Sequence, residues 1–298
     1  YKKGVRPFSE VAEGRMTVKE FLAQMTDEEV AHLLGGQPNT GVANTFGWGN
    51  MPEYGIPNCM TADGPAGLRI APECGVTTTA WPCATLLAAT WNPNVVYQVG
   101  AAGGKEVKEN NIAAWLTPAL NIHRSPLCGR NFEYYSEDPL LAGVLAGAMV
   151  KGIQSQGVAA TVKHFALNNK ETDRKHSDSR VSERAAREIY LKAFEYVIKG
   201  AKPWAVMSSY NIINGCYASE NKELLEDILR DEWGFDGMVT TDWWTLGEHY
   251  KEVKAGNDMK MACGDPKRLK EAMDQGLLTR QDLEHCAERV LNLILKLD

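Results

Sequence analysis

The chain has 298 residues, of which 44% are apolar and 23% are charged, and its formal net charge is −6. A chain of this length can bury a large core and suits one α/β barrel or two smaller domains. The acidic balance argues against a nucleic-acid-binding protein, which normally has a basic face, and no apolar run approaches the ~20 residues that span a bilayer.

The first predicted elements are helices that begin with capping boxes. Thr17 with Glu20, and then Thr26 with Glu29, have the spacing in which two side chains satisfy open backbone donors at a helix start. The second of these helices is predicted to end at the glycine pair that begins with Gly35.

From residue 56 onwards, short apolar or β-branched runs alternate with helical patterns. The clear strands are predicted at 56–61, 112–120, 158–162, 204–207, 238–241 and 259–261. The helices between and after them are predicted at 93–108, 139–154, 182–199, around 224–229 and from 279 onwards. Such alternation is typical of βαβ units and of a mostly parallel sheet.

Polar residues follow nearly every predicted strand. They are Asp63, Asn121, His123, Lys163, His164, Ser208, Ser209, Tyr210 and Asp242. A barrel assembles its active site from many strand ends at one face, whereas the GxGxxG turn or P-loop of many open sheets is missing here. We therefore predict an α/β fold, a (β/α)8 TIM-like barrel over residues 26–298 with scope for irregular first strands, after an N-terminal extension over 1–25.

Asp242 ends the strand predicted at 238–241 and is followed by Trp243 and Trp244. Indole faces stack well on the C–H faces of sugar rings, which makes this strand end a candidate sugar site. An isolated aspartate at a strand end more often caps the next helix. The other motifs have to decide between these two roles.

Three cationic or polar residues are further candidates. Lys163 and His164 end a predicted buried strand, where such groups are costly without partners. They could bind vicinal hydroxyls and pair with a carboxylate, or they could form a structural salt bridge. Arg130 lies in a loop, 129–139, with three aromatic and three acidic residues, so we expect this loop to pack over the barrel mouth or to bind ligand.

The motifs at these strand ends, taken together, resemble a known family. In chain order they are DGPAGLR from Asp63, GRNFEYYSEDP from Gly129, KHFALNN from Lys163, SSYN from Ser208 and MVTTDWW from Met238. Each is weak alone, but in this order and spacing they resemble the barrel domain of glycoside hydrolase family 3, of the β-glucosidase type. The resemblance extends roughly from Thr26 to Leu297.

This resemblance implies a retaining, exo-acting β-glucosidase that releases non-reducing terminal β-D-glucosyl residues through a covalent intermediate on Asp242. It also implies which residues shape the subsite for that sugar: Asp63, Arg69, Arg130, Lys163, His164, Met207, Tyr210 and Trp243. The cations nearby, expected to be Lys163, His164 and Arg130, would keep the nucleophile ionised. The implied partner is a β-glucoside or oligosaccharide, and no metal or cofactor is implied, because this hydrolysis needs only carboxylates and water.

A retaining glycosidase also needs a second carboxyl group ~5 Å from the nucleophile, and the sequence offers no convincing candidate. In this type of family member, a glutamate from a second domain, an α/β sandwich, protonates the leaving oxygen. That domain is absent from this chain, so we expect the acid/base from outside it and expect the chain alone to be nearly inactive. The exact sugar, the aglycone and the oligomeric state stay open.

Members of the same family with other substrates also fit the motifs. A β-xylosidase or a β-N-acetylhexosaminidase is possible, and the hexosaminidases carry an acid/base histidine on the loop after KHF, about where His176 lies. Arg174 stands where the partner aspartate would be, so His176 is expected to lack an orienting carboxylate. A non-catalytic carbohydrate-binding barrel and an aldolase that uses Lys163 as a Schiff base belong to different functional classes.

The cysteines bear on the cellular compartment. Seven of them are scattered along the chain without a CxxC pair, and the six histidines show no HExxH spacing. An odd, dispersed set is a poor disulfide framework and a poor zinc site. Together with a start at Tyr1 that shows no apolar leader, this favours free thiols and a cytoplasmic location.

Overall fold

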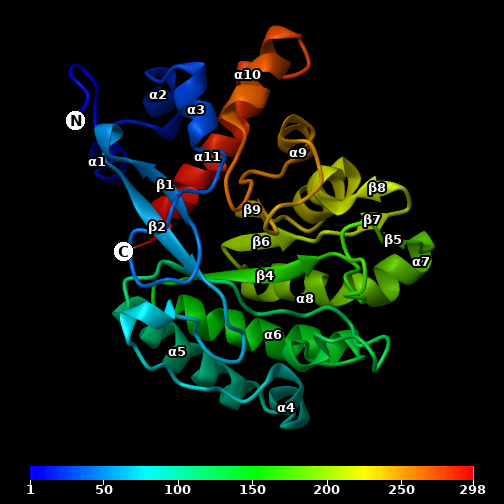
Figure 1. The fold of residues 1–298 in the computed structure, drawn as a ribbon. Coiled ribbons are helices and arrows are strands. Elements are labelled where there is room, and N and C mark those ends of the chain that lie inside the picture. Colours follow the sequence, from blue (N-terminus) through cyan, green and yellow to red (C-terminus); the bar gives the residue numbers. More distant parts are fainter. Residues whose placement is uncertain (298) are drawn as a thin grey trace.

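A computed structural model describes residues 1–297, so that Asp298, the last residue of the predicted domain, lies outside the described residues. The centre is a six-stranded sheet in the order β1-β2-β3-β4-β6-β9, strongly curled and surrounded by helices (Figure 1). Its strands are β1 Gly47–Met51, β2 Ile56–Ala62, β3 Ala114–Trp115, β4 Ala159–Phe165, β6 Ala205–Ser208 and β9 Met238–Thr241. The predicted mixed α/β fold is confirmed.

Most neighbouring strands are parallel, as the alternating pattern predicts, but β1 pairs antiparallel with β2. Beyond the named strands, isolated bridges extend the sheet at both edges. Met259 is bridged to Thr240 and Lys260 to Gly35, both parallel, while Gln37 is bridged antiparallel to Gly47. The predicted strand at 259–261 is therefore reduced to bridges, and segments far apart in the sequence lie side by side.

The glycine pair at residues 35 and 36 has a different role from the one predicted. The helix before it, α3 Asp27–His32, ends before the pair, with Leu33 as its C-cap. A Cβ on Gly36 would lie 1.8 Å from the carbonyl oxygen of Ala262. The glycines therefore allow the close approach of two backbone segments where the sheet edges meet.

The longer helices pack around the sheet. On one side α5 Pro93–Glu109, α6 Pro139–Gln154 and α8 Lys192–Ala201 lie next to one another. The other helices are α1 Ser9–Ala12, α2 Val18–Ala23, α4 Ala84–Ala89, α7 Glu183–Ala185, α9 His249–Ala255, α10 Pro266–Asp274 and α11 Arg280–Lys296, with π-helical turns η4 Ala186–Tyr190 and η6 Glu223–Glu232. In the described residues, no helix is long and apolar enough to cross a membrane.

Short elements complete the chain. A small second sheet consists of β5 Asp178–Ser179, β7 Ile212–Ile213 and β8 Cys216–Tyr217, and the 3-10 turns are η1 Pro52–Tyr54, η2 Pro72–Cys74, η3 Asn131–Glu133 and η5 Ala218–Glu220. The predicted capping boxes at Thr17 and Thr26 are present. Phe21, within the predicted extension, is fully buried against Phe8 and Tyr54.

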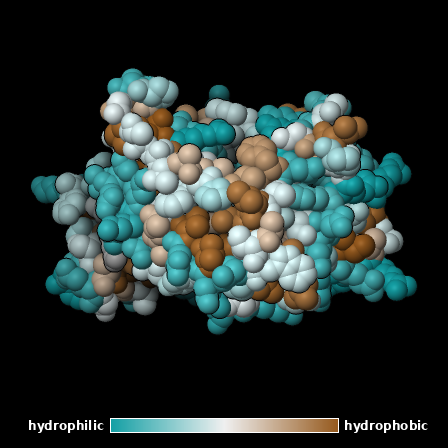
Figure 2. All heavy atoms as spheres, turned by 90° about the horizontal axis from the view of Figure 1, so that it is seen from below, coloured by the Kyte–Doolittle hydropathy of each residue, from teal (hydrophilic) through white to brown (hydrophobic). Residues whose placement is uncertain are grey.

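The face over α4, α5 and α6 carries apolar side chains between polar ones (Figure 2). The large apolar side chains that these helices expose are Leu86, Tyr97, Leu140 and Val144. Apolar atoms form more than half of an ordinary folded surface, so this face by itself indicates no function.

A buried ion cluster fastens β9 to its neighbours. Asp258 is fully buried, and its Oδ2 accepts hydrogen bonds from the backbone N–H of Val239 at 2.8 Å and from Arg230 at 2.7 Å. Its Oδ1 accepts from Arg289 of α11 at 3.1 Å. One carboxylate thus joins η6 and α11 to β9, the strand that leads to Asp242.

Replacing Asp258 with asparagine should lower the free energy of unfolding by about 2–4 kcal/mol, because the buried Arg230 and the partly buried Arg289 would lose the carboxylate between them and would share only Glu226. Chemical denaturation of the chain followed by circular dichroism measures this. The matched control is Asp227→Asn, since Asp227 pairs with Lys222 at 3.1 Å on the surface and should contribute less than about 1 kcal/mol. Equal losses in the two variants would contradict a structural role for the buried cluster.

Candidate active site

A cavity of about 480 Å³ lies at the carboxyl ends of the strands. It is lined by Asp63, Arg69, Arg130, Phe132, Glu133, Lys163, His164, Arg174, Met207, Tyr210, Asp242 and Trp243. Every residue proposed from the sequence for the sugar subsite is among them. The structure therefore brings together residues that come from the ends of β2, β4, β6 and β9 and from the loop around η3.

Lys163 and His164 both reach this cavity, although neighbouring residues of a regular strand point to opposite faces. The pairing of β4 with β6 shifts register between Val162 and Phe165, and an irregularity of this kind re-aims side chains at a strand end. Both side chains are almost fully buried. A buried amine and imidazole at one site need polar partners.

Lys163 finds its partner in Asp63. Its Nζ lies 3.9 Å from Oδ1 of Asp63. Oδ2 of Asp63 accepts a hydrogen bond from Asn44 at 3.2 Å, and the backbone N–H of Asp63 donates to the same asparagine side chain at 3.1 Å. Asp63 is thus held in place while about a third of its side chain stays exposed, which leaves it able to accept bonds from a ligand.

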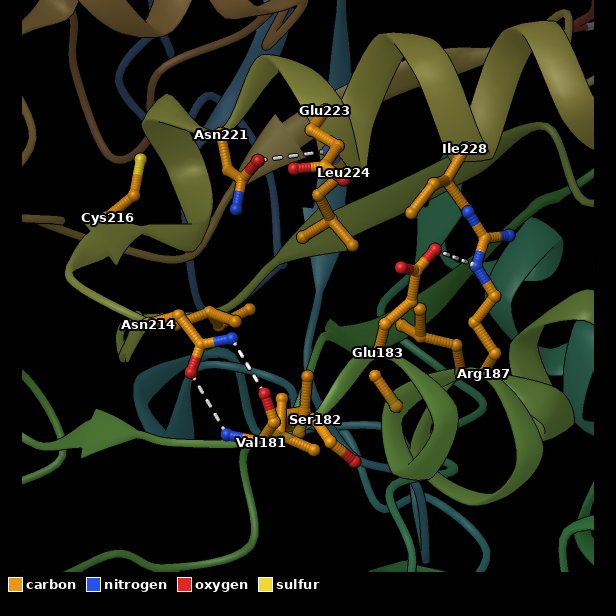
Figure 3. A pocket seen from close by; sticks show the side chains of 14 residues that line it. Val181, Ser182, Glu183, Arg187, Asn214, Cys216, Asn221, Glu223, Leu224 and Ile228 are labelled. Atoms are coloured by element: carbon orange, nitrogen blue, oxygen red, sulfur yellow. Dashed lines mark hydrogen bonds and ion pairs between the residues drawn. The ribbon is translucent and has the colours of Figure 1, made fainter.

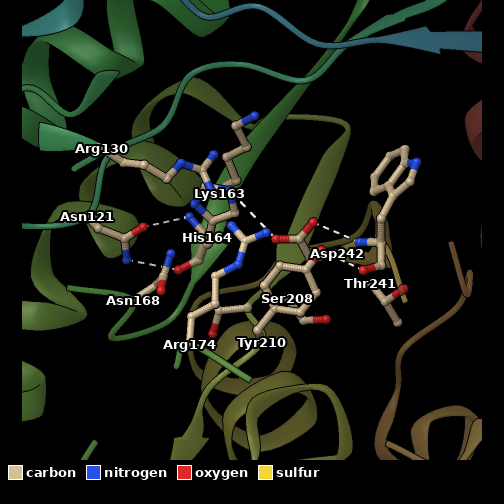
Figure 4. A network of polar contacts seen from close by, with 12 residues as sticks. Asn121, Arg130, Lys163, His164, Asn168, Arg174, Ser208, Tyr210, Thr241 and Asp242 are labelled. Carbon is tan, nitrogen blue, oxygen red and sulfur yellow. Dashed lines mark hydrogen bonds and ion pairs between the residues drawn. The ribbon is translucent and has the colours of Figure 1, made fainter. Parts of the chain in front are cut away.

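The surroundings of His164 favour its neutral form. Burial lowers its pKa well below the ordinary value, and the charges of Arg130, Lys163 and Arg174 lower it further. The prediction that His164 acts as a cation is therefore wrong, because neighbouring positive charges oppose its protonation. Its Nδ1 lies 2.9 Å from the hydroxyl of Tyr134, and its Nε2 faces Oδ2 of Asp242 at 3.8 Å (Figure 4).

Asp242 does not cap the following helix. The N-cap of α9 is Glu248, while Oδ1 of Asp242 accepts a hydrogen bond from the backbone N–H of Trp243 at 2.7 Å. Burial raises the pKa of Asp242, whereas that hydrogen bond and the cations in the cavity lower it. The second oxygen faces the cavity beside His164. The net result is a pKa above the ordinary aspartate value, and the cations of the cavity limit this rise.

Aromatic side chains frame the carboxylate. The hydroxyl of Tyr210 donates to the backbone oxygen of Trp243 at 2.5 Å, and the indole N–H of Trp243 donates to Thr45 at 2.6 Å. Both rings are thus tied to the backbone around the strand end. Met207 adds an apolar surface from the end of β6.

The loop around η3 also closes on the cavity. Arg130 forms an ion pair with the buried Glu133, and its Nη1 lies 3.8 Å from Glu171. Phe132 of the same loop contributes to the wall but stays half exposed. The prediction from the sequence that this loop packs over the barrel mouth agrees with this position.

Sequence reasoning did not select several polar residues around the cavity, among them Glu133, the partner of Arg130. Tyr134 contacts His164, Asn168 donates to the Tyr134 hydroxyl at 3.3 Å, and Arg174 forms part of the cavity wall. Tyr134 and Asn168 lie inside motifs that were recognised in the sequence, but the motifs alone did not predict a role for either residue. Arg174 carried no signal, because only the folded loop brings it to the cavity.

His176 has a carboxylate partner after all. Its Nδ1 lies 2.8 Å from Oδ1 of Asp173, and both side chains are about two-thirds exposed. The expectation that His176 lacks an orienting carboxylate is therefore wrong, because the neighbour of Arg174 supplies one. The pair does not line the cavity within the described chain.

A second cavity, of about 410 Å³, lies between α7 and η6 (Figure 3). Several of its polar side chains already have partners within the protein. The Asn214 amide forms two hydrogen bonds with the backbone of Val181, and Arg187 forms ion pairs with Glu183 and Glu232. Of the described residues that line it, none was predicted for the sugar subsite. Residues 1–297 also contain no cluster of histidine, cysteine or acidic side chains that could hold a metal ion.

Comparison with known proteins supports the resemblance. The family model of the glycosyl hydrolase family 3 N-terminal domain matches residues 50–293. The chain is 65% identical over 279 residues to beta-glucosidase A of Butyrivibrio fibrisolvens, covering 94% of this chain and 34% of the relative. It is 44% identical to an exo-alpha-(1->6)-L-arabinopyranosidase of Bifidobacterium longum, covering 91% and 36%.

A solved structure agrees with the fold. Beta-glucosidase 3B of Thermotoga neapolitana, determined in complex with alpha-D-glucose, superimposes with a TM-score of 0.90 at 43% identity, covering 94% of this chain and 43% of that one. The chain thus spans about a third of the length of the curated relatives it matches.

Proposed function

The chain belongs to glycoside hydrolase family 3, and on that basis we propose that it is the nucleophile-bearing part of a retaining, exo-acting β-glucosidase. The observation that carries the proposal is the convergence of Asp242, Lys163 and Asp63 with aromatic side chains on one cavity. A carboxylate, hydroxyl-binding groups and apolar ring faces are what a glycosidase subsite requires.

In the first step, Oδ2 of Asp242 attacks the anomeric carbon as the bond to the leaving oxygen breaks. The leaving oxygen takes a proton from an acid, and a covalent glycosyl–Asp242 ester forms. In the second step, the residue that acted as the acid acts as a base and removes a proton from water. The water oxygen attacks the anomeric carbon, and the bond to Asp242 breaks. The two inversions leave the β-configuration retained.

The remaining residues bind the terminal sugar. Asp63 accepts hydrogen bonds from hydroxyl groups, and Lys163 and Arg130 donate to them. Trp243 offers its face to the ring, and Arg69 and Met207 complete the wall. A site that bonds each hydroxyl rejects sugars that lack one, because a buried polar group then stays unpaired.

The proton donor is proposed to lie outside this chain. We propose that an α/β sandwich domain or chain supplies the acid/base glutamate, because relatives of this family are about three times as long and the other two carboxylates that line the cavity, Asp63 and Glu133, are paired with Lys163 and Arg130. This chain would then comprise the barrel over 26–298 and, before it, the extension over 1–25. Its curled sheet and edge bridges support an irregular (β/α)8 barrel.

Among sugars, β-D-glucose is proposed first, because both a 65% identical relative and a closely superimposing structure are named β-glucosidases. The similarity to an arabinopyranosidase favours testing pentopyranoses as well. Xylose and arabinopyranose both lack the hydroxymethyl group of glucose.

The full-length protein should hydrolyse 4-nitrophenyl β-D-glucoside with a kcat/KM at least about 10-fold above that for the β-D-xyloside and the α-L-arabinopyranoside, because both lack the hydroxymethyl group that a glucose subsite would contact. Proton NMR during hydrolysis should show β-glucose as the first product. A preference for a pentoside would change the sugar assignment, and α-glucose as the first product would contradict the retaining mechanism.

The same substrates, extended by an N-acetylglucosaminide, distinguish a glucosidase from a hexosaminidase, a carbohydrate-binding barrel and a Schiff-base enzyme. A preference for the N-acetylglucosaminide that disappears in His176→Ala would favour the hexosaminidase, whose histidine needs a carboxylate partner such as Asp173, 2.8 Å from His176. Glucoside binding without turnover by the full-length protein would indicate a carbohydrate-binding barrel. A borohydride-trapped adduct on Lys163 would indicate a Schiff-base enzyme.

A further inference from the structure

Arg174 reaches the cavity from the loop that follows β4. Its guanidinium carbon lies 4.5 Å from the centre of the Tyr210 ring, and it lines the same cavity as Asp242. Figure 4 shows its side chain directed toward Tyr210 and the carboxylate. The contact therefore links the loop after β4 to Tyr210, which follows β6, beside the proposed nucleophile.

Glu171 holds the guanidinium in this place. Nη1 of Arg174 donates to Oε2 of Glu171 at 2.9 Å. The other oxygen, Oε1, accepts from Asn168 at 3.3 Å and lies 3.8 Å from Nη1 of Arg130. One carboxylate thus connects the two arginines of the cavity, and a planar guanidinium held in this way keeps a defined orientation.

The stacked ring is in turn connected to the strand end of Asp242. The Tyr210 hydroxyl donates to the backbone oxygen of Trp243. Lys175 lies 4.9 Å from the centre of the same ring, and its Nζ donates to the backbone oxygen of Trp244 at 2.9 Å. Two consecutive cations of one loop therefore hold Tyr210 and the backbone that follows the nucleophile.

We propose that Arg174 is a positioning residue for the attack by Asp242: its stack on Tyr210 fixes the tyrosine beside the carboxylate, and its charge favours the ionised carboxylate. This inference rests on the proposed function. Such a residue would affect the reaction without contacting the anomeric carbon.

The charges around Asp242 give the direction of the effect. The titratable and charged groups that line the cavity with it are Asp63, Arg69, Arg130, Glu133, Lys163, His164, Arg174 and Tyr210. Burial raises the pKa of Asp242, while the Trp243 N–H and the cations Arg130, Lys163 and Arg174 lower it. Removing the Arg174 charge would raise that pKa further. As the pH falls, Asp242 would then become protonated, and unable to attack, at a higher pH than in the unmodified protein.

The test is the pH dependence of kcat/KM for 4-nitrophenyl β-D-glucoside with the full-length protein. In Arg174→Met, the acid limb should move up by about 0.5–1 pH unit, as expected for the loss of a partly exposed cation near a carboxylate. Arg174→Lys keeps the charge, so its acid limb should stay near that of the unmodified protein. Its kcat should still fall several-fold, because an ammonium group cannot stack as a planar guanidinium does.

The matched control is Arg268→Met. The guanidinium carbon of Arg268 lies 4.8 Å from the centre of the Tyr250 ring, and neither residue lines the cavity. This substitution should leave the pH profile unchanged. An unshifted acid limb in Arg174→Met, or an equal shift in Arg174→Lys, would overturn the inference. If Arg174→Met does not fold, as judged by thermal melting, an unchanged kcat in Arg174→Lys would overturn it instead. If the unmodified protein does not hydrolyse the glucoside, the proposed function fails rather than the role of Arg174.

Discussion

Replacement of Asp242 by glycine is expected to lower kcat of the full-length protein for aryl β-glucosides at least about 10,000-fold, because the covalent step loses its nucleophile. KM should change far less, since the other cavity residues that would bind the sugar remain. Steady-state kinetics with 4-nitrophenyl β-D-glucoside measures both constants.

Azide makes this prediction specific to the role of the carboxylate. In Asp242→Gly, the space left by the side chain should admit azide, which would attack the anomeric carbon from the same side and yield an α-glucosyl azide. The control is Asp236→Asn, an exposed aspartate in the turn before the same strand, which should keep full activity. Persistent activity in Asp242→Gly would remove the carboxylate from the mechanism, and a β-azide product would contradict attack from the nucleophile's side.

The isolated 298-residue chain is expected to hydrolyse cellobiose roughly 100- to 10,000-fold more slowly than the full-length protein, which is the usual contribution of a general acid and base. The cavity places Asp242 beside His164 and Lys163. His164 cannot replace a carboxylic acid, because burial lowers its pKa and favours the neutral imidazole, whose remaining N–H is too weakly acidic to protonate the leaving group. Turnover by the two proteins under the same conditions measures the difference.

The leaving group separates a missing acid from a damaged site. A dinitrophenyl glucoside needs little protonation on departure, so the isolated chain should release dinitrophenol in a burst and then stall as the glycosyl–Asp242 ester. The burst should be absent when Asp242→Gly is made in the same isolated chain. Hydrolysis of cellobiose by the isolated chain at the full-length rate would show that the acid/base lies within it.

Most helix starts and the positions of most strands were right because they depend on local patterns, although the strand predicted at 112–120 is reduced to the two residues of β3 and the one at 259–261 to isolated bridges. Alternating runs predicted the parallel strands, and each capping box needs only two side chains three residues apart. The antiparallel β1 was not predicted, since it lies in a loop-like stretch rich in glycine and asparagine. Its pairing with β2 depends on the turn at η1.

The set of residues at the cavity was predicted from the order of the motifs, whereas their individual states were not. The sequence suggested a cationic His164 and an unpartnered His176. The structure shows that burial and neighbouring cations keep His164 neutral, and that a turn in the loop brings Asp173 to His176. A pKa depends on the distances and burial of groups from several strands, and these are set only when the chain folds.

The sequence by itself therefore determined the fold class, the family and the strand ends that carry chemistry, with Asp242 at the last of the motifs. The tertiary structure decided that Asp242 faces a cavity rather than a helix N-terminus. It also showed that Glu171 and Tyr210 hold Arg174 beside Asp242. Motifs are local and can be recognised one by one, but a contact between two loops exists only after the sheet has curled and brought their strands together.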